Sequence, residues 1–505
     1  MKRLGIVELN STEVKLLIVE VLENQSYVTL LKEESKIKIA SDLVADELIK
    51  QQSIFNVISV LKTYKSLMSA YKVVECFALA TNEYANAKNQ RSFFEEIYSS
   101  TNFKFKIMSQ DEEISNLYVA FINSLDCPKG LILNINGTES QVFAYNRRNS
   151  LNRAYFNVGS VSYAEKYVEK YSTPAEAMDV MTKDFATEVA SLDWFKELDE
   201  ETQIVGTGDV FLSIAKLSKK LKKYPFARDH SYQFTKEDLD QVYDFVKTLD
   251  IDKTKKLKGI SSQSADMLAS GVSMVKAFAE KSGFSKFVVS TYGISEGNIL
   301  GKVNPITLEK PISDVLGASL ETQNLYYNNS GLQNTANVYE LSLILFKQLK
   351  VLHKLPRNFV KVLRIASYLH DCGKRVSPIN FEKKGLNVVL DCDVLGVAHH
   401  EQVLAAFVVA SQNLQDFSMV DWVRYNSMVS ETDLEGVRKL AVIVKLATML
   451  DSFGLGKIKD ISCDILGDSV IMKTIVEEPA DMEISESMKV RSDFAKAFKK
   501  HLEIL

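Results

Sequence analysis

Apolar positions along the chain follow two spacings, one typical of strands and one typical of helices. Short apolar runs at 4–9 and 14–22 flank a polar turn and predict two paired strands, with a third strand expected near 27–40. A second apolar run, polar turn and apolar run at 131–146 predict another hairpin. The chain therefore carries one hairpin pattern twice.

The two hairpins correspond residue by residue in their turns, which we interpret as an internal duplication. The matched positions are Glu8 with Asn134, Asn10 with Asn136, Thr12 with Thr138, and Glu13 with Glu139. Two such turns that face each other across a cleft can direct backbone N–H groups at one anion from both sides. The pattern thus predicts a phosphate-binding concavity between the turns.

Strand-like and helix-like stretches alternate after each hairpin, which favours an α/β fold for roughly the first 300 residues. A helix is expected at 44–69 with Asp42 as its cap, then a buried strand at 72–81. A sparse stretch with Pro305, Pro311 and the segment 328–331 marks a boundary. Beyond it the pattern is mostly helical, with a strand-like tail. The domains expected are two α/β lobes at 1–125 and 126–302 and a helical domain at 303–505, with the tail at 461–476.

Composition narrows the class of protein. A chain of 505 residues is too long for one hydrophobic core, and its net charge of −4 gives no general attraction to nucleic acid or membranes, so neither partner is expected. The five cysteines have no zinc-type spacing. We find no signal peptide and no apolar run of about 18 residues, so we expect a cytoplasmic protein. Two lysine-rich stretches, 216–223 and 253–258, leave two alternatives open: solvated helix faces or a path for a long polyanion.

Several segments stand out by their order and spacing: 107-IMSQDEEISNLYVAF-121, the turn at 206–208, 290-STYGISEG-297, 366-ASYLHDCGK-374 and 446-LATMLD-451. Together they resemble the exopolyphosphatase / guanosine pentaphosphate phosphohydrolase (Ppx/GppA) family, and the last two resemble its HD-like segments. The resemblance implies a duplicated α/β core of the actin-like ATPase (ribonuclease H-like) type, followed by an all-α HD-like domain. It also implies a homodimer that uses Mg²⁺ to hydrolyse terminal phosphoanhydride bonds of polyphosphate or of a guanosine nucleotide, guanosine pentaphosphate.

The first family loop, D-x-G-S-N-S, is similar to residues 8–13. The resemblance implies that Glu8 binds the metal and that Asn10, Ser11 and Thr12 bind phosphate. Asn10 replaces a glycine, which is tolerable if its φ is positive. Glu13 replaces a serine and brings a negative charge to a place where phosphate would lie, where like charges about 4 Å apart repel by about 1 to 4 kcal/mol.

The second family loop, D-x-G-G-G-S-T-E, is similar to residues 134–141. Both of its carboxylates are amides here, Asn134 and Gln141, which keep a neutral oxygen but lose the charge that binds a divalent ion. Asn134 is therefore a poor metal ligand. The phosphate-binding residues that the resemblance implies in this half are Asn136, Gly137, Thr138, Gly206, Thr207 and Gly208.

Of the family's cationic and water-orienting residues, the first is replaced here and the second is kept. Its T-x-x-x-R segment begins at Thr81, and the arginine has become Ala85, so Lys88 or Arg91 would have to replace it. Glu113 matches the carboxylate that orients water and is the catalytic candidate. The alternative is that Glu113 only complements the positive end of a helix dipole.

The HD-like segments allow a second metal site. The matching residues are His370, Asp371 and Asp451. The first histidine of such a site is missing, because Asn334 or Asn337 stands at its expected position, and His399 or His400 would have to replace it. His370 and Asp371 are then either a structural hydrogen-bonded pair or metal ligands.

Three functions stay open from the sequence. The first is a phosphoanhydride hydrolase of the exopolyphosphatase type with reduced or lost turnover. The second is a non-catalytic protein that binds polyphosphate or a nucleotide and regulates another process. The third, a metal-dependent phosphohydrolase in the HD-like domain, is disfavoured by the missing histidine.

Overall fold

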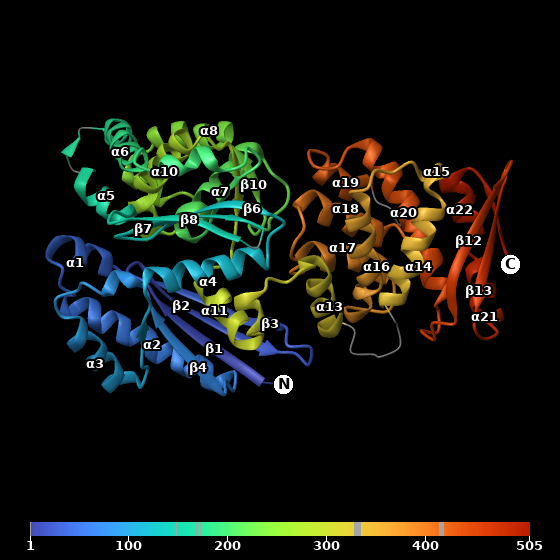
Figure 1. Ribbon diagram of the computed structural model, residues 1–505, viewed down its shortest axis with the longest axis horizontal. Helices are drawn as coiled ribbons and strands as arrows, with labels where there is room; N and C mark the ends of the chain where they lie inside the picture. The colour runs from blue at the N-terminus through green and yellow to red at the C-terminus, as the bar shows by residue number, and fades with distance from the viewer. Residues whose placement is uncertain (1, 148, 168–169, 172, 328–334, 414–418) are drawn as a thin grey trace. The chain divides into compact units, whose positions relative to one another are not determined.

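The computed structural model describes residues 2–505 except residues 148, 168–169, 172, 328–334 and 414–418 (Figure 1). The chain forms two compact units, residues 1–224 with 228–313 and residues 225–227 with 314–505. The boundary segment 328–331 and Asn334, both used above, lie outside the described residues. Within the described part of the chain, no helix is long and apolar enough to cross a membrane.

The first lobe of the first unit is built on a sheet of strand order β3-β2-β1-β4-β5. β1 and β2 pair antiparallel up to Leu9 and Val14, and β4 runs parallel to β1. The apolar side chains of β1 and β2 on one face pack against α1, α2 and α3, which form the core of this lobe. Its elements are β1 (Lys2–Leu9), β2 (Glu13–Val21), β3 (Tyr27–Lys36), α1 (Ile39–Asp46), α2 (Gln51–Ala70), β4 (Glu75–Ala80), η1 (Asn82–Tyr84), α3 (Gln90–Thr101), β5 (Lys106–Ile107) and α4 (Gln110–Ile122).

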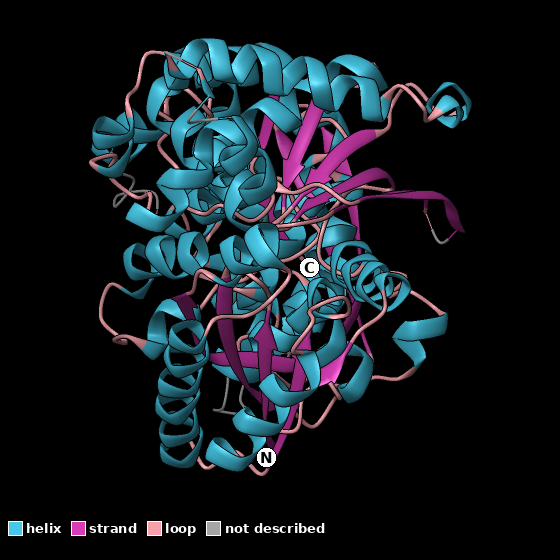
Figure 2. Ribbon diagram, turned by 90° about the vertical axis from the view of Figure 1, so that its left-hand side faces the viewer, coloured by secondary structure: helices cyan, strands magenta, loops and turns pink. Residues whose placement is uncertain are grey.

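The second lobe repeats this plan in a sheet of order β10-β11-β9-β6-β7-β8. Figure 2 draws the strands in magenta and the helices in cyan. Its hairpin strands pair up to Ile135 and Ser140, and β9 runs parallel to β6 as β4 does to β1. The duplication inferred from the hairpins is therefore present in the fold. The elements are β6 (Lys129–Ile135), β7 (Ser140–Asn146), β8 (Asn149–Phe156), α5 (Ser160–Tyr167), α6 (Pro174–Val189), η3 (Asp193–Glu197), β9 (Gln203–Gly206), α7 (Gly208–Lys222), β10 (Gln233–Thr235), α8 (Lys236–Lys247), α9 (Ile251–Lys255), α10 (Ser262–Ser282), β11 (Lys286–Val289), α11 (Ile294–Val303) and α12 (Ile306–Glu309).

Two helices join the lobes by crossing between them. α4 follows the strands of the first lobe, but its residues Leu117 and Phe121 pack with Ile132 and Phe143 of the second sheet. α11 follows the second lobe, and its Ile299 packs on the first sheet. Figure 1 shows both helices between the two sheets. The lobes are thus held together by apolar contacts beside the two hairpin turns.

The predicted helix at 44–69 is wrong as a single helix. α1 ends at Asp46, the next residue, Glu47, has a left-handed φ of 53°, and α2 begins at Gln51. Asp42, expected to cap the long helix, lies inside α1, and its carboxylate accepts hydrogen bonds from Lys50 N–H (3.1 Å) and the Ser53 hydroxyl (2.6 Å). The Asp42 carboxylate of α1 thus binds the start of α2. The apolar pattern looks continuous in the sequence, although the chain forms two helices.

The second unit is mostly helical. Its apolar helices surround α20, whose inner face is almost entirely buried. The expected strand-like tail is a hairpin in a three-stranded sheet of order β12-β13-β14. The elements are α13 (Val315–Tyr327), α14 (Thr335–Gln348), α15 (Lys350–His353), α16 (Phe359–Tyr368), η4 (Cys372–Arg375), α17 (Phe381–Asp391), α18 (His399–Ala410), α19 (Met419–Tyr425), α20 (Glu431–Leu450), β12 (Ile458–Leu466), β13 (Ser469–Val476), α21 (Asp481–Met488), α22 (Arg491–Phe498) and β14 (His501–Ile504).

Candidate functional site

The turns of the two duplicated hairpins touch. A Cβ atom added to Gly137 would lie 2.4 Å from Ser11 Oγ and 2.8 Å from the Ala40 side chain. Since real Cβ contacts are longer, only glycine allows this approach. Gly137 is one of the predicted phosphate-binding residues, and its role in the structure is to let the second turn reach the first.

The carboxylate of Glu83 lies between the two turns. Glu83 belongs to η1 and is buried. It accepts hydrogen bonds from the first turn, from Ser11 N–H (3.1 Å) and the Ser11 hydroxyl (2.6 Å). It accepts others from the second turn, from Thr138 N–H (2.8 Å) and the Thr138 hydroxyl (2.9 Å), and one from the Thr81 hydroxyl (3.2 Å). An internal anion thus takes the donors that phosphate-binding turns direct at a ligand.

The first turn is stabilised by its own asparagine. Asn10 Oδ1 accepts hydrogen bonds from Thr12 N–H (2.9 Å) and Glu13 N–H (2.7 Å), an Asx-type turn. Asn10 has no positive φ, contrary to the condition expected for it. The side chain of Asn10 thus already bonds the backbone donors of the turn, and the phosphate-binding roles of Asn10 and Thr12 stay predictions.

Glu8, the predicted metal ligand of the first loop, is buried and already bonded. Its Oε2 accepts hydrogen bonds from Ser295 N–H (3.1 Å) and the Ser295 hydroxyl (2.6 Å) at the start of α11. Its Oε1 lies 3.6 Å from Lys15 Nζ. A lysine ammonium therefore lies beside this carboxylate where the family resemblance implies a metal.

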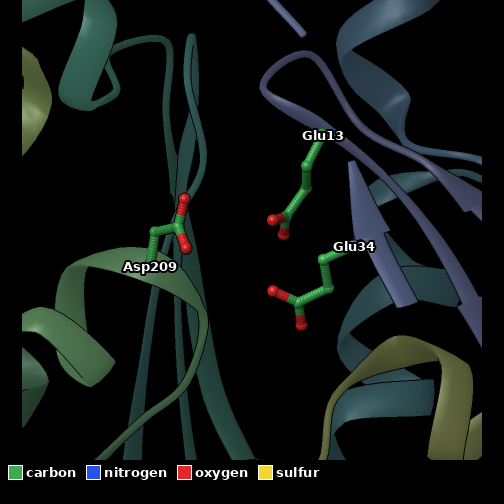
Figure 3. A group of neighbouring side chains, drawn as sticks. All are labelled: Glu13, Glu34 and Asp209. Atoms are coloured by element: carbon green, nitrogen blue, oxygen red, sulfur yellow. The ribbon is translucent and has the colours of Figure 1, made fainter. Parts of the chain in front are cut away.

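Lysines also neutralise the acidic cluster of Glu13, Glu34 and Asp209, whose carboxylate oxygens lie within 4.8 Å of one another. Figure 3 shows Asp209 on the second lobe facing Glu13 and Glu34 on the first. Lys36 bonds both Glu13 and Asp209, and Lys15 Nζ lies 2.8 Å from Glu13. Burial alone would raise the pKa of Glu13, but the two lysines outweigh it and lower that pKa.

The sequence predicts that Glu13 brings its charge to the place where phosphate would lie, and in the structure this charge is paired with lysines. Its carboxylate turns toward Lys15 and Lys36. Among the described residues, this cluster is the one group of three or more acidic, histidine or cysteine side chains with such close ligand atoms. Its cation is the ammonium group of Lys36.

The second loop forms a chain of amides that ends on Glu113. Asn134 Nδ2 donates to Gln141 Oε1 (3.4 Å), and Gln141 Nε2 donates to Glu113 Oε2 (2.5 Å). Glu113 Oε1 accepts from Asn82 N–H (2.5 Å). The two amides that replace the family's carboxylates therefore offer N–H groups as well as oxygens. A cation can bind the oxygens but not the N–H groups.

Glu113 is fully buried, in the first turn of α4. Burial raises the pKa of its carboxyl well above the ordinary value, and the nearby Glu139 raises it further. Burial also raises the pKa of Glu139, and Glu83 adds to this increase. The catalytic candidate therefore lies on α4, between the lobes, in surroundings that favour its protonated form.

The turn at 206–208 is present at the start of α7. Gly208 has a φ of 76°, and the Thr207 hydroxyl donates to Tyr292 O (3.0 Å). A Cβ on Gly206 would lie 2.1 Å from the Phe211 ring. These residues form the tight entry into α7, whose next residue, Asp209, bonds Lys36.

The candidate replacements for the lost arginine point elsewhere. Lys88 Nζ lies 3.4 Å from Glu47, and Arg91 Nε lies 2.8 Å from Glu95. Both side chains are exposed on the surface of the first lobe. Ala85 therefore has no cationic substitute from this pair.

The HD-like residues lie in the second unit. Asp451 Oδ1 accepts a hydrogen bond from Gly456 N–H (2.8 Å), Asp371 pairs with Lys374 at 3.5 Å, and burial lowers the pKa of His370. His400 pairs with Asp433 at 3.6 Å rather than turning to this group. Within the described residues these side chains do not form a group with the close ligand spacing found at Glu13.

The residues present do not fit the Mg²⁺ ion that the resemblance implies. Magnesium prefers several carboxylate or water oxygens in an octahedral arrangement. Here Glu8 is bonded by a serine and approached by Lys15, while Asn134 and Gln141 have no charge. The cavities that remain beside the turns measure about 30 and 50 Å³. They hold a few waters at most, whereas sites for small ligands usually measure about 300–1,000 Å³.

Sequence reasoning missed Glu83 and the two lysines Lys15 and Lys36, besides Glu34, Asp209 and Ser295. Glu83 lies inside the segment 81–85 that was compared with the family's T-x-x-x-R. Lys15 and Lys36 lie on paired strands near Glu13. The signal that could have revealed them is charge balance, because a buried Glu13 needs cationic partners.

Fold and site together define a two-lobed protein of the actin-like ATPase fold, in which the two hairpin turns meet between the lobes. The model of the Ppx/GppA phosphatase family matches residues 17–305. Because this match covers more than half of the chain, the chain belongs to that family.

Known relatives agree with this assignment. The bifunctional 3-dehydroquinate synthase/phosphatase of Fusobacterium nucleatum subsp. nucleatum is 22% identical over 312 residues, which are 59% of this chain and 45% of that protein. The chain thus spans less than half the length of this curated relative.

Solved structures show the same fold. The Ppx/GppA family member from Aquifex aeolicus superposes with a TM-score of 0.52 at 19% identity, covering 60% of this chain and 98% of that one. An exopolyphosphatase from Cytophaga hutchinsonii gives a TM-score of 0.57 at 16% identity, covering 61% of this chain and 100% of that one.

Proposed function

We propose that this protein is a Ppx/GppA-family member that has lost phosphoanhydride hydrolysis and keeps its two lobes closed around its own charges. The observation that carries the proposal is the Glu83 carboxylate, which accepts hydrogen bonds from both phosphate-loop turns. A substrate phosphate would have to displace this carboxylate and would meet a cleft lined by further acids.

The expected chemistry is altered at three points. A water-orienting base must be ionised, but burial favours the protonated form of Glu113. The two carboxylates of the second family loop are amides here, Asn134 and Gln141, and the arginine is an alanine, Ala85. Since one stabilising donor alone is worth about 10²–10³ in rate, losing these parts together removes several orders of magnitude. Their effects are coupled and should not be multiplied as independent factors.

The test is phosphate release from long-chain polyphosphate and from guanosine pentaphosphate, with and without MgCl₂. We expect a rate below about 10⁻² s⁻¹, at least a thousandfold under the typical enzyme median of about 10 s⁻¹. The matched variant is Glu113→Gln, which should leave this residual rate unchanged. Release at an ordinary rate that Glu113→Gln abolishes would overturn the proposal.

A second candidate function is binding without turnover, favoured by the N–H groups of Ser11 and Thr138, which still point at one anion. The ligand would be polyphosphate or a guanosine nucleotide, whose terminal phosphate takes the place of the Glu83 carboxylate. Calorimetry with each ligand compares wild type with Glu83→Ala. Heat for both proteins supports this candidate, and no heat from wild type at millimolar ligand rejects it.

The family resemblance also leads us to propose a homodimer. Light scattering of the purified chain measures its mass in solution. A mass of one chain at micromolar concentration would reject this assembly.

A further inference from the structure

One cavity of the first unit lies outside the cleft between the turns and measures about 410 Å³. Its floor is four consecutive residues of β4, and its walls come from the loop before β5, from α4 and from α11. The lining residues are Cys76, Phe77, Ala78, Leu79, Lys104, Lys106, Met108, Glu112, Ser115, Asn116, Asn298 and Lys302. All of them belong to the first unit.

The lining carries excess positive charge in a chain whose net charge is −4. Three of its residues are lysines and one is a glutamate, Glu112, which bonds Lys106. Within the described chain, no carboxylate lies within ion-pair distance of Lys104 or Lys302, and Lys302 Nζ lies 4.9 Å from the centre of the Phe77 ring. Two ammonium groups in this cavity, those of Lys104 and Lys302, therefore have no carboxylate partner among the described residues.

The floor adds backbone groups to these lysines. β4 pairs with β1 from Glu75 to Ala80, but on its other side β5 pairs only with Leu79 and Ala80. The edge from Glu75 to Ala78 has no strand partner in the described structure. Peptide N–H groups at such an edge can bind an anion that lies along it. Lysines near a sheet edge also guard against aggregation, so their presence alone would not identify a site.

This cavity is much larger than the cavities in the cleft. Its volume of about 410 Å³ falls in the range of about 300–1,000 Å³ that is usual for small-molecule sites. The cavities beside the hairpin turns, at about 30 and 50 Å³, are much smaller. From the unmatched lysines, the open strand edge and the volume, we propose that this cavity binds a small polyanion, one with two or more phosphate or carboxylate groups, at a site separate from the cleft.

Calorimetry on the full chain tests the proposal, with inorganic tripolyphosphate as the phosphate probe and citrate as the carboxylate probe. We expect one site per chain. Its dissociation constant should rise between about 50 and 200 mM salt, because salt weakens the contacts between phosphate and lysine. The variant Lys104→Ala/Lys302→Ala should weaken binding at least tenfold. The matched control, Lys62→Ala/Lys196→Ala, removes the same charge from exposed surface elsewhere and should bind as wild type does.

Binding of either probe that follows this pattern supports the site, and the probe that binds better identifies the anion class. No heat with both probes at 1 mM, or equal loss in the control variant, would overturn it. Binding that Glu83→Ala abolishes while Lys104→Ala/Lys302→Ala leaves it intact would also overturn it, because the anion would then lie in the cleft. The outcome does not depend on hydrolysis, so a failure here is distinct from a failure of the proposed loss of turnover.

Discussion

Replacing Glu83 by alanine removes the anion that both hairpin turns bind. The carboxylate accepts five hydrogen bonds, two from Ser11, two from Thr138 and one from Thr81. The hydroxyls can rotate toward other acceptors, but the two backbone N–H groups cannot. The variant therefore leaves two buried donors facing a small space between the turns.

The expected loss follows from these two donors. A hydrogen bond to a charged group contributes about 1.5–3 kcal/mol net, and a buried donor left without an acceptor costs about 1–3 kcal/mol. Water can enter the vacated space and offset part of this cost. Removal of Glu83 also relieves its repulsion of Glu139. We therefore expect Glu83→Ala to destabilise the first unit by about 3 kcal/mol.

Inorganic phosphate should restore this stability in the variant alone. A phosphate that fills the vacated position at about 100 times its dissociation constant stabilises by about 2.7 kcal/mol, close to the full loss. The wild-type position is already filled by its own carboxylate. The specific effect of phosphate is thus predicted to appear only after the substitution.

Urea unfolding followed by tryptophan fluorescence measures both effects. The chain has two tryptophans, Trp194 in the first unit and Trp422 in the second, so Trp422→Phe leaves a reporter for the first unit alone. Phosphate and chloride buffers are compared at equal ionic strength. The matched control is Glu95→Ala, an exposed acid paired with Arg91 on the surface of α3. Unchanged stability of Glu83→Ala, or an equal phosphate effect in wild type and variant, would refute the reasoning.

Two further predictions concern the charges around this position. Because folding raises the pKa of Glu113, wild-type stability is full below the ordinary value of 4.5 and declines as pH rises through the raised pKa. Glu113→Gln should flatten this decline in urea unfolding across pH, and an unchanged slope would contradict it. Lys36→Met leaves Glu13 and Asp209 without their shared cation, so it should cost about 3 kcal/mol, and calcium should stabilise the variant more than wild type in thermal unfolding. Equal calcium effects would contradict the role of Lys36.

The overall fold could be predicted because its signals are local and repeated. Each hairpin has an apolar run on both sides of a polar turn, and the duplication gives the second half once the first is recognised. The break after α1 could not be predicted in this way, because it depends on Glu47 in a left-handed conformation and on Asp42 reaching α2 through space. The helical pattern itself shows no interruption there.

The site was predicted less completely, since it depends on which charges meet. The sequence indicates that Asn134 and Gln141 lack charge and that Glu113 lies at the start of a helix. It does not reveal that Glu83, on a short turn after β4, reaches between two loops about 70 and 55 residues away. For the same reason Glu13 was assigned to the phosphate position, whereas strand pairing places Lys15 and Lys36 around it.

A crystal structure of the wild-type chain grown with pyrophosphate and MgCl₂ tests the central claim most directly. The account predicts the Glu83 carboxylate within hydrogen-bond distance of Ser11 N–H and Thr138 N–H, with no phosphate and no metal between the turns. A phosphate group bonded to both turns, with Glu83 displaced from them, would contradict the account.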